Sequence, residues 1–96
     1  MYAVVGTWLM DAAQQEMQDR VLHEQIVPMV KQAPGFVSAY WGRAVDGAES
    51  VSFVVFDDQA AAEAFAATVN TDPEDRGQYG VEPSGRLAIV EISATA

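Results

Sequence analysis

The 96-residue chain has no cysteine, a single histidine (His23) and only five basic residues. Without cysteine it forms no disulfide and has neither a thiol nucleophile nor a thiolate metal site. One histidine also excludes the common metal sites built from several histidines. The sequence contains no Gly-rich phosphate loop, no Gly-x-Ser-x-Gly motif and no Walker motif. These absences exclude the enzyme classes that short motifs identify, and they predict that no metal is bound.

Basic residues are outnumbered by 14 acidic ones, which gives a formal net charge of −9. Lys and Arg supply most of the affinity for nucleic acid and for anionic lipid, so neither is an expected partner. The apolar start, residues 1–10, lacks the basic region of an export signal and is too short to span a membrane. We interpret it as a strand and expect a cytoplasmic location.

Hydrophobic residues make up half of the chain, which is ample for a globular core. The length predicts one domain, residues 1–96. Apolar and turn-forming residues alternate so that four strands are expected at Tyr2–Leu9, Phe36–Arg43, Ser50–Phe56 and Arg86–Ser93. Helices are expected over Asp11–Ala33 and from about residue 59 to about residue 69.

Three features refine these elements. Pro28 lies inside the first helix, where a proline removes a hydrogen bond and clashes with the preceding turn. We therefore expect either a kink near Glu24 or a break at which Pro28 opens a second short helix. Asp46-Gly47 is typical of a hairpin turn between the second and third strands. The segment 71–85 is predicted to be a long polar loop.

The order β-α-β-β-α-β predicts an α+β, ferredoxin-like domain with both helices on one face of an antiparallel sheet. Both faces of the third strand are apolar, with Val51, Phe53 and Val55 on one and Val54 and Phe56 on the other. A soluble monomer would not leave such a sheet face in water, so we expect two copies to pair through their sheets.

Four stretches of the chain carry a resemblance to a known group: YAVVGTW, IVPMVKQAPGF, VSAYW and VVFDDQAAAEAF. With them the chain resembles the antibiotic-biosynthesis-monooxygenase-like (ABM) family of the dimeric α/β barrel superfamily. The resemblance implies a homodimer with facing sheets and a small-molecule pocket between each sheet and its own helices. Some members oxygenate quinol-like or polyketide aromatics without metal or flavin, which implies no cofactor. Others degrade haem, and many have no known activity.

Several residues depart from the pattern of the active members. The aromatic residue that ends the third strand, often Trp, is Phe56 here. Active relatives often carry a His late in the second helix or just after it, whereas residues 66–75 contain none. Asn70 is the nearest match to the polar helper of some oxygenases.

The candidate catalytic residues are Tyr40, Trp41, His23 and Asn70. His23 is either a general base oriented by Asp19 or a solvated residue on the charged face of the helix. Tyr40 and Trp41 are neighbours on a strand and face opposite sides. One of the two is expected to line the pocket and the other to pack against the partner subunit.

The candidate ligand-binding residues are Trp8, Tyr40, Trp41, Arg43, Phe56 and Tyr79. For the aromatic residues the alternative is packing in the core or interface. Arg43 and Arg86 are either anchors for a carboxylate or phenolate or members of salt bridges. Tyr79 is either a lid over the pocket or a flexible surface residue.

Two functional hypotheses remain open from the sequence. The first is a cofactor-independent monooxygenase that acts on a small aromatic or quinol-type compound. The second is a non-catalytic dimer that binds a small ligand or has a structural role.

Overall fold

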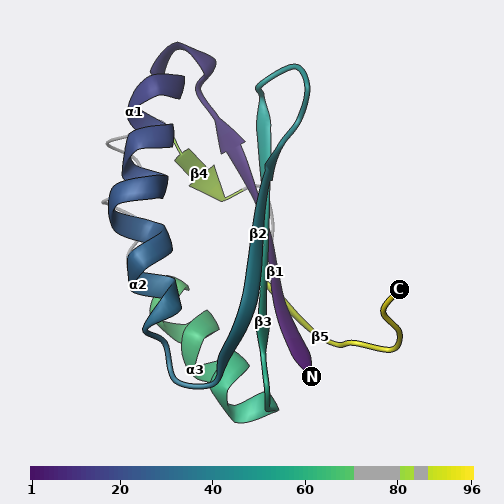
Figure 1. Cartoon of the computed structure of the whole chain (residues 1–96). Coiled ribbons are helices and arrows are strands. Elements are labelled where there is room, and N and C mark those ends of the chain that lie inside the picture. Colours follow the sequence, from purple (N-terminus) through teal and green to yellow (C-terminus); the bar gives the residue numbers. More distant parts are fainter. Residues whose placement is uncertain (71–80, 84–86) are drawn as a thin grey trace.

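A layer of helices covers one face of an antiparallel sheet in the computed structural model, which describes residues 1–70, 81–83 and 87–96 (Figure 1). The strands are β1 (Tyr2–Met10), β2 (Phe36–Arg43), β3 (Glu49–Phe56), β4 (Val81–Pro83) and β5 (Ala88–Glu91). The helical segments are η1 (Ala12–Gln14), α1 (Gln15–Val21), η2 (Leu22–Ile26), α2 (Val27–Lys31) and α3 (Gln59–Asn70). This arrangement confirms the predicted ferredoxin-like α+β fold.

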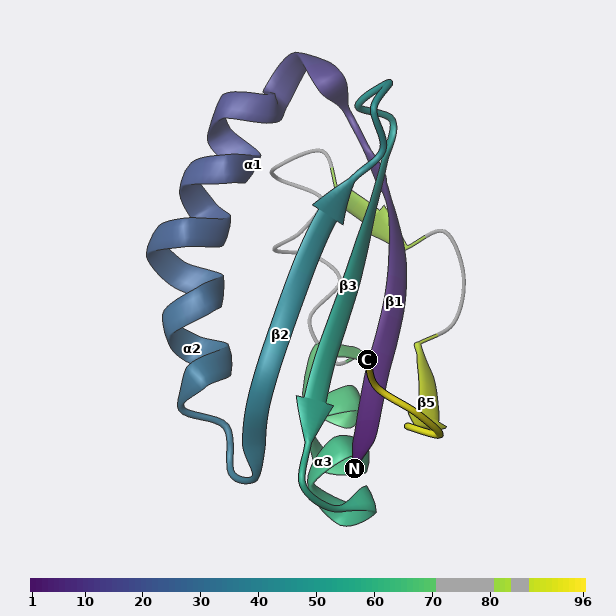
Figure 2. The ribbon, with the colours of Figure 1, turned by 45° about the vertical axis from the view of Figure 1, so that its right-hand side comes forward.

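The sheet has the order β2-β3-β1, and β4 and β5 both pair with the remaining edge of β1 (Figure 2). The single last strand expected over 86–93 was therefore only partly right, because β5 covers four residues of it. β4 lies inside the segment predicted to be a loop, and that part of the prediction was wrong. β5 pairs with Tyr2–Val5, so β4 supplies partners for the other end of the nine-residue β1, at Trp8–Met10.

The β2–β3 hairpin turns at the predicted Asp46-Gly47 pair. Gly47 has φ +80°, a conformation that costs glycine little, and its N–H donates to the carbonyl of Ala44 over 2.8 Å. The side chain of Asp46 accepts from the N–H of Ala48 over 2.9 Å. This tight turn fixes the register in which β2 and β3 pair.

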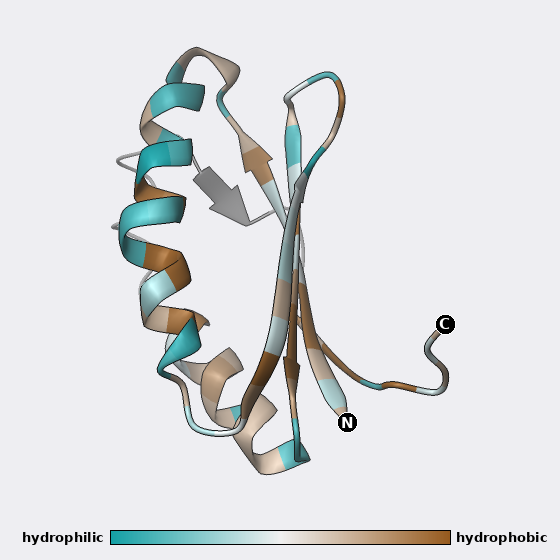
Figure 3. Cartoon of the chain, in the orientation of Figure 1, coloured by the Kyte–Doolittle hydropathy of each residue, from teal (hydrophilic) through white to brown (hydrophobic). Residues whose placement is uncertain are grey.

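The first helical layer runs from Ala12 to Lys31 as four consecutive segments. Asp11 caps its start, since its Oδ1 accepts a hydrogen bond from the N–H of Ala13 over 3.0 Å. The charged face of this layer is exposed and carries Glu16, Arg20, His23, Glu24 and Lys31. Figure 3 shows that hydrophilic residues recur along this helical layer.

Pro28 explains why this helix is not uniform. It stands at the first turn of α2, and the five residues just before that helix, Leu22–Ile26, form a π-helix. Proline offers no N–H to the carbonyl four residues earlier and its ring clashes there, so the preceding turn widens. The sequence predicted a kink near Glu24 or a break opened by Pro28; the structure has a π-turn over Leu22–Ile26 and places Pro28 in the first turn of the short helix α2.

The core lies between the sheet and α2 and α3. Its fully buried residues include Val4, Val30, Val54 and Phe56, and the ring of Phe56 packs against that of Phe65 at a centroid distance of 5.2 Å. Asp58 caps α3, because its Oδ1 accepts a hydrogen bond from the N–H of Ala61 over 2.7 Å. The small alanines of α3 allow this helix to approach the sheet closely.

The sheet face away from the helices stays apolar and uncovered in the single chain. Strand pairing places Leu9, Tyr40, Val51 and Val90 on that face, where each is between 39% and 68% exposed. None of the helices in the described part of the chain is long and apolar enough to cross a membrane.

Candidate ligand pocket

A cavity of about 580 Å³ lies between the sheet and the first helical layer, within the ordinary size range of small-molecule sites. Strand residues form its floor: Val4, Trp8, Met10, Trp41, Arg43, Ser50, Ser52 and Val54. Helical residues form its roof: Gln18, Asp19, Val21, Leu22, His23, Gln25, Ile26, Met29 and Val30. Leu87 and the last turns of α3 complete the wall.

Strand register explains why the floor is hollow. Gly6, Ser52 and Trp41 are paired across three strands, so they share the helix-facing side of the sheet. Trp8, Ser50 and Arg43 form the next row in the same way. Small side chains therefore occupy the middle of the floor, while two indoles and a guanidinium surround it.

Gly6 leaves room for the side chains that pack over it beside the cavity. A Cβ atom added there would lie 2.6 Å from Cδ2 of Leu87, 3.1 Å from Oγ of Ser52 and 3.2 Å from the ring of Trp8. The absence of a side chain lets the indole of Trp8 lie near Ser52, and Nε1 of Trp8 donates a hydrogen bond to Oγ of Ser52 over 3.2 Å.

The π-helix contributes several residues to the roof. Leu22, His23, Gln25 and Ile26 all belong to it and all line the cavity. A π-turn changes the angle at which successive side chains leave the helix, and such turns are frequent at functional sites. Pro28 thus affects the cavity through the shape of the helix before it.

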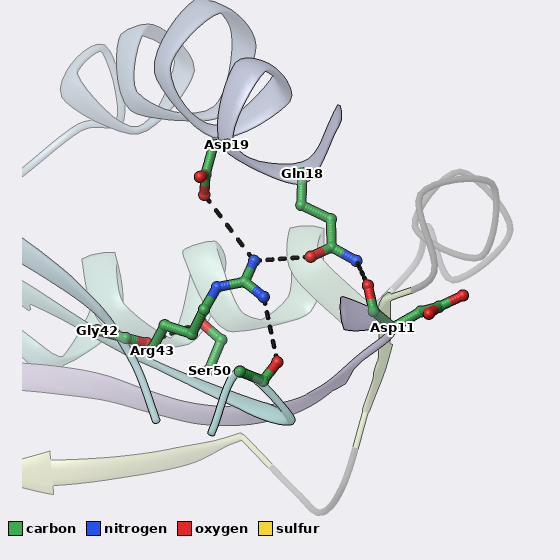
Figure 4. A network of polar contacts seen from close by, with 7 residues as sticks. Asp11, Gln18, Asp19, Gly42, Arg43 and Ser50 are labelled. Carbon is green, nitrogen blue, oxygen red and sulfur yellow. Dashed lines mark hydrogen bonds and ion pairs between the residues drawn. The ribbon is translucent and has the colours of Figure 1, made fainter. Parts of the chain in front are cut away.

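Arg43 organises the polar end of the cavity (Figure 4). Its NH2 group donates to Oε1 of Gln18 over 2.6 Å and its NH1 group donates to the carbonyl of Gly47 over 3.2 Å. Nε2 of Gln18 in turn donates to the carbonyl of Asp11 over 2.8 Å. This chain of bonds ties the start of the helical layer to the β2–β3 hairpin.

Asp19 also takes part, with one carboxylate oxygen 3.9 Å from NH2 of Arg43. The sequence offered Asp19 as the residue that orients His23, but its carboxylate is directed toward Arg43 instead. The Arg43 side chain is 19% exposed and that of Asp19 is 52% exposed, so solvent weakens this ion pair. Arg43 therefore has the salt-bridge role that the sequence left open, and it also lines the cavity.

The structure separates the candidate residues. Trp8, Trp41 and Arg43 line the cavity, and His23 lies at its exposed rim. Tyr40 is on the opposite sheet face and is 68% exposed. Trp41 is therefore the member of this pair that faces the cavity. Phe56 is fully buried in the core and outside the cavity lining. Tyr79, Arg86 and the side chain of Asn70 lie outside the described residues.

Two lining residues of this site escaped the sequence reasoning, namely Gln18 and Ser52. Gln18 is 5% exposed and Ser52 is 8% exposed, so both are buried polar groups. A signal was present for each. Gln18 lies three and four residues before the apolar Val21 and Leu22, and Ser52 alternates with Val54 and Phe56.

Among the described residues, no group of three or more side chains suited to holding a metal ion is present. The cavity is mostly apolar and has aromatic faces, with hydrogen-bonding groups gathered at the Arg43 end and on the floor. Such an arrangement suits a flat organic molecule that carries one or two polar atoms.

No protein-family model matches the chain, and no curated protein matches it. Several solved structures do match the chain. HapK from Hahella chejuensis superposes with a TM-score of 0.73 at 19% identity, covering 100% of this chain and 96% of HapK. A candidate antibiotic biosynthesis monooxygenase from Deinococcus radiodurans gives 0.68 at 16% identity, over 100% of this chain and 94% of the other. The chain has the fold of the ABM-like proteins.

A third ABM-like neighbour was solved with a ligand. The monooxygenase ActVA-Orf6 of Streptomyces coelicolor, in complex with nanaomycin D, gives a TM-score of 0.60 at 18% identity and covers 99% of this chain and 88% of that enzyme. At identities below 20% these superpositions establish a shared fold only. The reaction must be argued from the site itself.

Proposed function

We propose that this ABM-like chain, as one domain, binds a small aromatic or quinol-type compound in the cavity and oxidises it as a cofactor-independent monooxygenase. The observation that carries the proposal is the hollow floor between Trp8 and Trp41. Trp8, Trp41 and the small Ser52 all line this floor, and two indoles suit a planar ring, since aromatic faces pack favourably on one another. The names of the ABM-like neighbours support this choice of reaction class.

In the proposed reaction the quinol itself supplies the electrons. One atom of O₂ is incorporated to give a hydroxyquinone, and the other leaves as water with the two hydrogens lost by the quinol. Arg43 acts at the polar end, where its positive charge favours the phenolate form of a bound quinol. The apolar residues of the roof, such as Val21, Ile26 and Val30, limit the access of water to the reacting ring.

Oxygen uptake with a panel of hydroquinones tests this function. We expect uptake that saturates with quinol concentration and that falls at least tenfold in Trp41→Ala. Binding is followed in parallel through tryptophan fluorescence, because both tryptophans of the chain line the cavity. A flat oxygen trace for every quinol would refute the oxygenase.

A non-catalytic ligand-binding or structural dimer is the second candidate, and one feature favours it. Asp19 and His23 are the described lining residues that could accept a proton, and both are exposed at the rim. Fluorescence quenching by aromatic compounds without any oxygen uptake would support this candidate.

We also propose that two copies pair through the apolar sheet face that carries Leu9, Tyr40 and Val51. Sheet-to-sheet pairing would remove this face from water, at a gain of about 25 cal/mol for each Å² buried. Light scattering at micromolar concentration is expected to give a dimer for the wild type and a monomer for Val51→Lys. A wild-type monomer would contradict the pairing.

A further inference from the structure

Ser52 has a hydrogen-bonding capacity that the protein leaves unused. Its side chain is on the cavity floor, and the residue is only 8% exposed. Its oxygen accepts the hydrogen bond from Nε1 of Trp8, so the hydroxyl proton must be directed elsewhere. Within the part of the chain that the structure describes, no protein atom accepts a hydrogen bond from this hydroxyl. A buried hydroxyl with a spare donor requires an acceptor.

Neighbouring polar groups of the cavity, in contrast, donate their hydrogen bonds to other protein atoms. The hydroxyl of Ser50, one row away on the same strand face, donates to the carbonyl of Gly42 over 3.0 Å. The amide of Gln18 donates to the carbonyl of Asp11, and Arg43 donates to Gln18 and to the carbonyl of Gly47. These groups hold the cavity together, whereas the Ser52 proton is available to whatever enters it.

The surroundings of Ser52 define where the acceptor must lie. Gly6 and Trp41 are its cross-strand neighbours, and the indole of Trp8 lies beside it. A planar ring resting between the two indoles therefore presents an edge or a ring substituent to this hydroxyl. When such a ring expels solvent from the floor, it must supply the acceptor that solvent supplied before, or binding weakens.

We propose that Ser52 orients the ligand by donating a hydrogen bond to a carbonyl or phenolic oxygen on the aromatic ring, and so selects rings that carry an acceptor oxygen. This inference rests on the proposed use of the cavity for an aromatic compound. It adds a specificity-determining residue and a required chemical feature of the ligand. The chain's charge of −9 favours a neutral acceptor over a permanently anionic one during approach.

The test compares 1-indanone with indane, which share a two-ring frame and differ in the carbonyl. Dissociation constants are measured by calorimetry for the wild type and for Ser52→Ala. We expect the preference for 1-indanone over indane to fall about three- to tenfold in Ser52→Ala, the usual net value of one hydrogen bond. Effects of the substitution on Trp8 or on cavity shape act on both compounds and cancel in the ratio. Ser38→Ala, on the opposite sheet face, is expected to keep the wild-type ratio.

The carbonyl stretch of bound 1-indanone gives a second measurement. A donated hydrogen bond lowers this frequency, so the infrared band is expected at lower wavenumber in the wild type than in Ser52→Ala. If Ser52→Ala does not fold, Ser52→Cys keeps the size with a much weaker donor and is expected to shift the ratio in the same direction.

The outcomes are distinct. An unchanged ratio and an unshifted carbonyl band, with both compounds bound, would overturn the role of Ser52 and leave the proposed aromatic pocket standing. Failure of both compounds to bind the wild-type protein would overturn the pocket as well.

Discussion

The bonds of Gln18 make a strong prediction about stability. Its buried amide accepts from Arg43 over 2.6 Å and donates to the carbonyl of Asp11 over 2.8 Å. A hydrogen bond to a charged group contributes about 1.5–3 kcal/mol and a neutral one about 0.5–1.5 kcal/mol. Arg43 keeps its bond to Gly47 and is partly exposed, so solvent recovers part of the loss. We therefore expect Gln18→Ala to lower the free energy of unfolding by about 2–4 kcal/mol.

Such a loss is large for a domain whose total stability is about 5–15 kcal/mol. Urea unfolding followed by circular dichroism measures it, at one fixed protein concentration because pairing of two copies would add to stability. Gln15→Ala is the matched control, since Gln15 is exposed on the same helix and is expected to change stability by less than about 0.5 kcal/mol.

A second variant separates the bond to Arg43 from the bond to the Asp11 carbonyl. Gln18→Glu keeps an acceptor for Arg43 but removes the donor to the Asp11 carbonyl, so its stability is expected to fall between Gln18→Ala and the wild type. Equal urea midpoints for Gln18→Ala and Gln15→Ala would refute the claim that this network stabilises the fold.

Two further predictions concern other parts of the chain. Gly35→Ala is expected to cost about 2–4 kcal/mol of unfolding free energy, because Gly35 has φ +80° and an added Cβ would lie 2.7 Å from Oδ1 of Asp57. In urea unfolding Gly42→Ala is its control, with nothing within 4 Å of the added atom and a near-neutral effect expected; equal losses would contradict the steric reasoning. Glu91, which accepts a hydrogen bond from the Tyr2 hydroxyl over 3.1 Å, raises the pKa of Tyr2 through that bond and through its charge. A raised pKa means that this contribution to stability is present below pH 10.0 and is lost as the pH rises through the folded-state value. Urea midpoints on both sides of pH 10.0 are expected to fall more steeply for the wild type than for Tyr2→Phe, and parallel curves would refute the link.

Local signals predicted most of the fold because the strands and helices follow from hydrophobic periodicity and from turn residues. β2 has the predicted bounds, and the hairpin turns where Asp46-Gly47 indicated. β4 was missed since a three-residue strand has no periodicity of its own. It is a strand because the end of β1 offers unpaired backbone groups, and that is a property of the assembled sheet.

The candidate site was harder to predict, for a reason that Tyr40 and Trp41 illustrate. Alternation along a strand requires the two residues to face opposite sides, but it does not say which side the helices cover. Pairing of Trp41 with Ser52, and of Ser52 with Gly6, puts Trp41 on the helix-facing side, and the second pairing joins strands far apart in sequence. Reading the sequence residue by residue therefore identifies Tyr40 and Trp41 as an aromatic pair. It does not show which of the two faces the helices.

Ser52 and Gln18 show what kind of signal was available and unused. Each is a polar residue at a position where periodicity calls for an apolar one, and each is buried. Burial of a polar side chain has a cost that its hydrogen bonds must offset, so a polar residue on an apolar stripe points either to an internal partner or to a ligand. For Gln18 the partners are Arg43 and Asp11, whereas Ser52 retains a proton that the described residues do not use. The same anomaly in sequence thus marks a structural network in one case and a ligand-facing donor in the other, and only the hydrogen-bond geometry separates them.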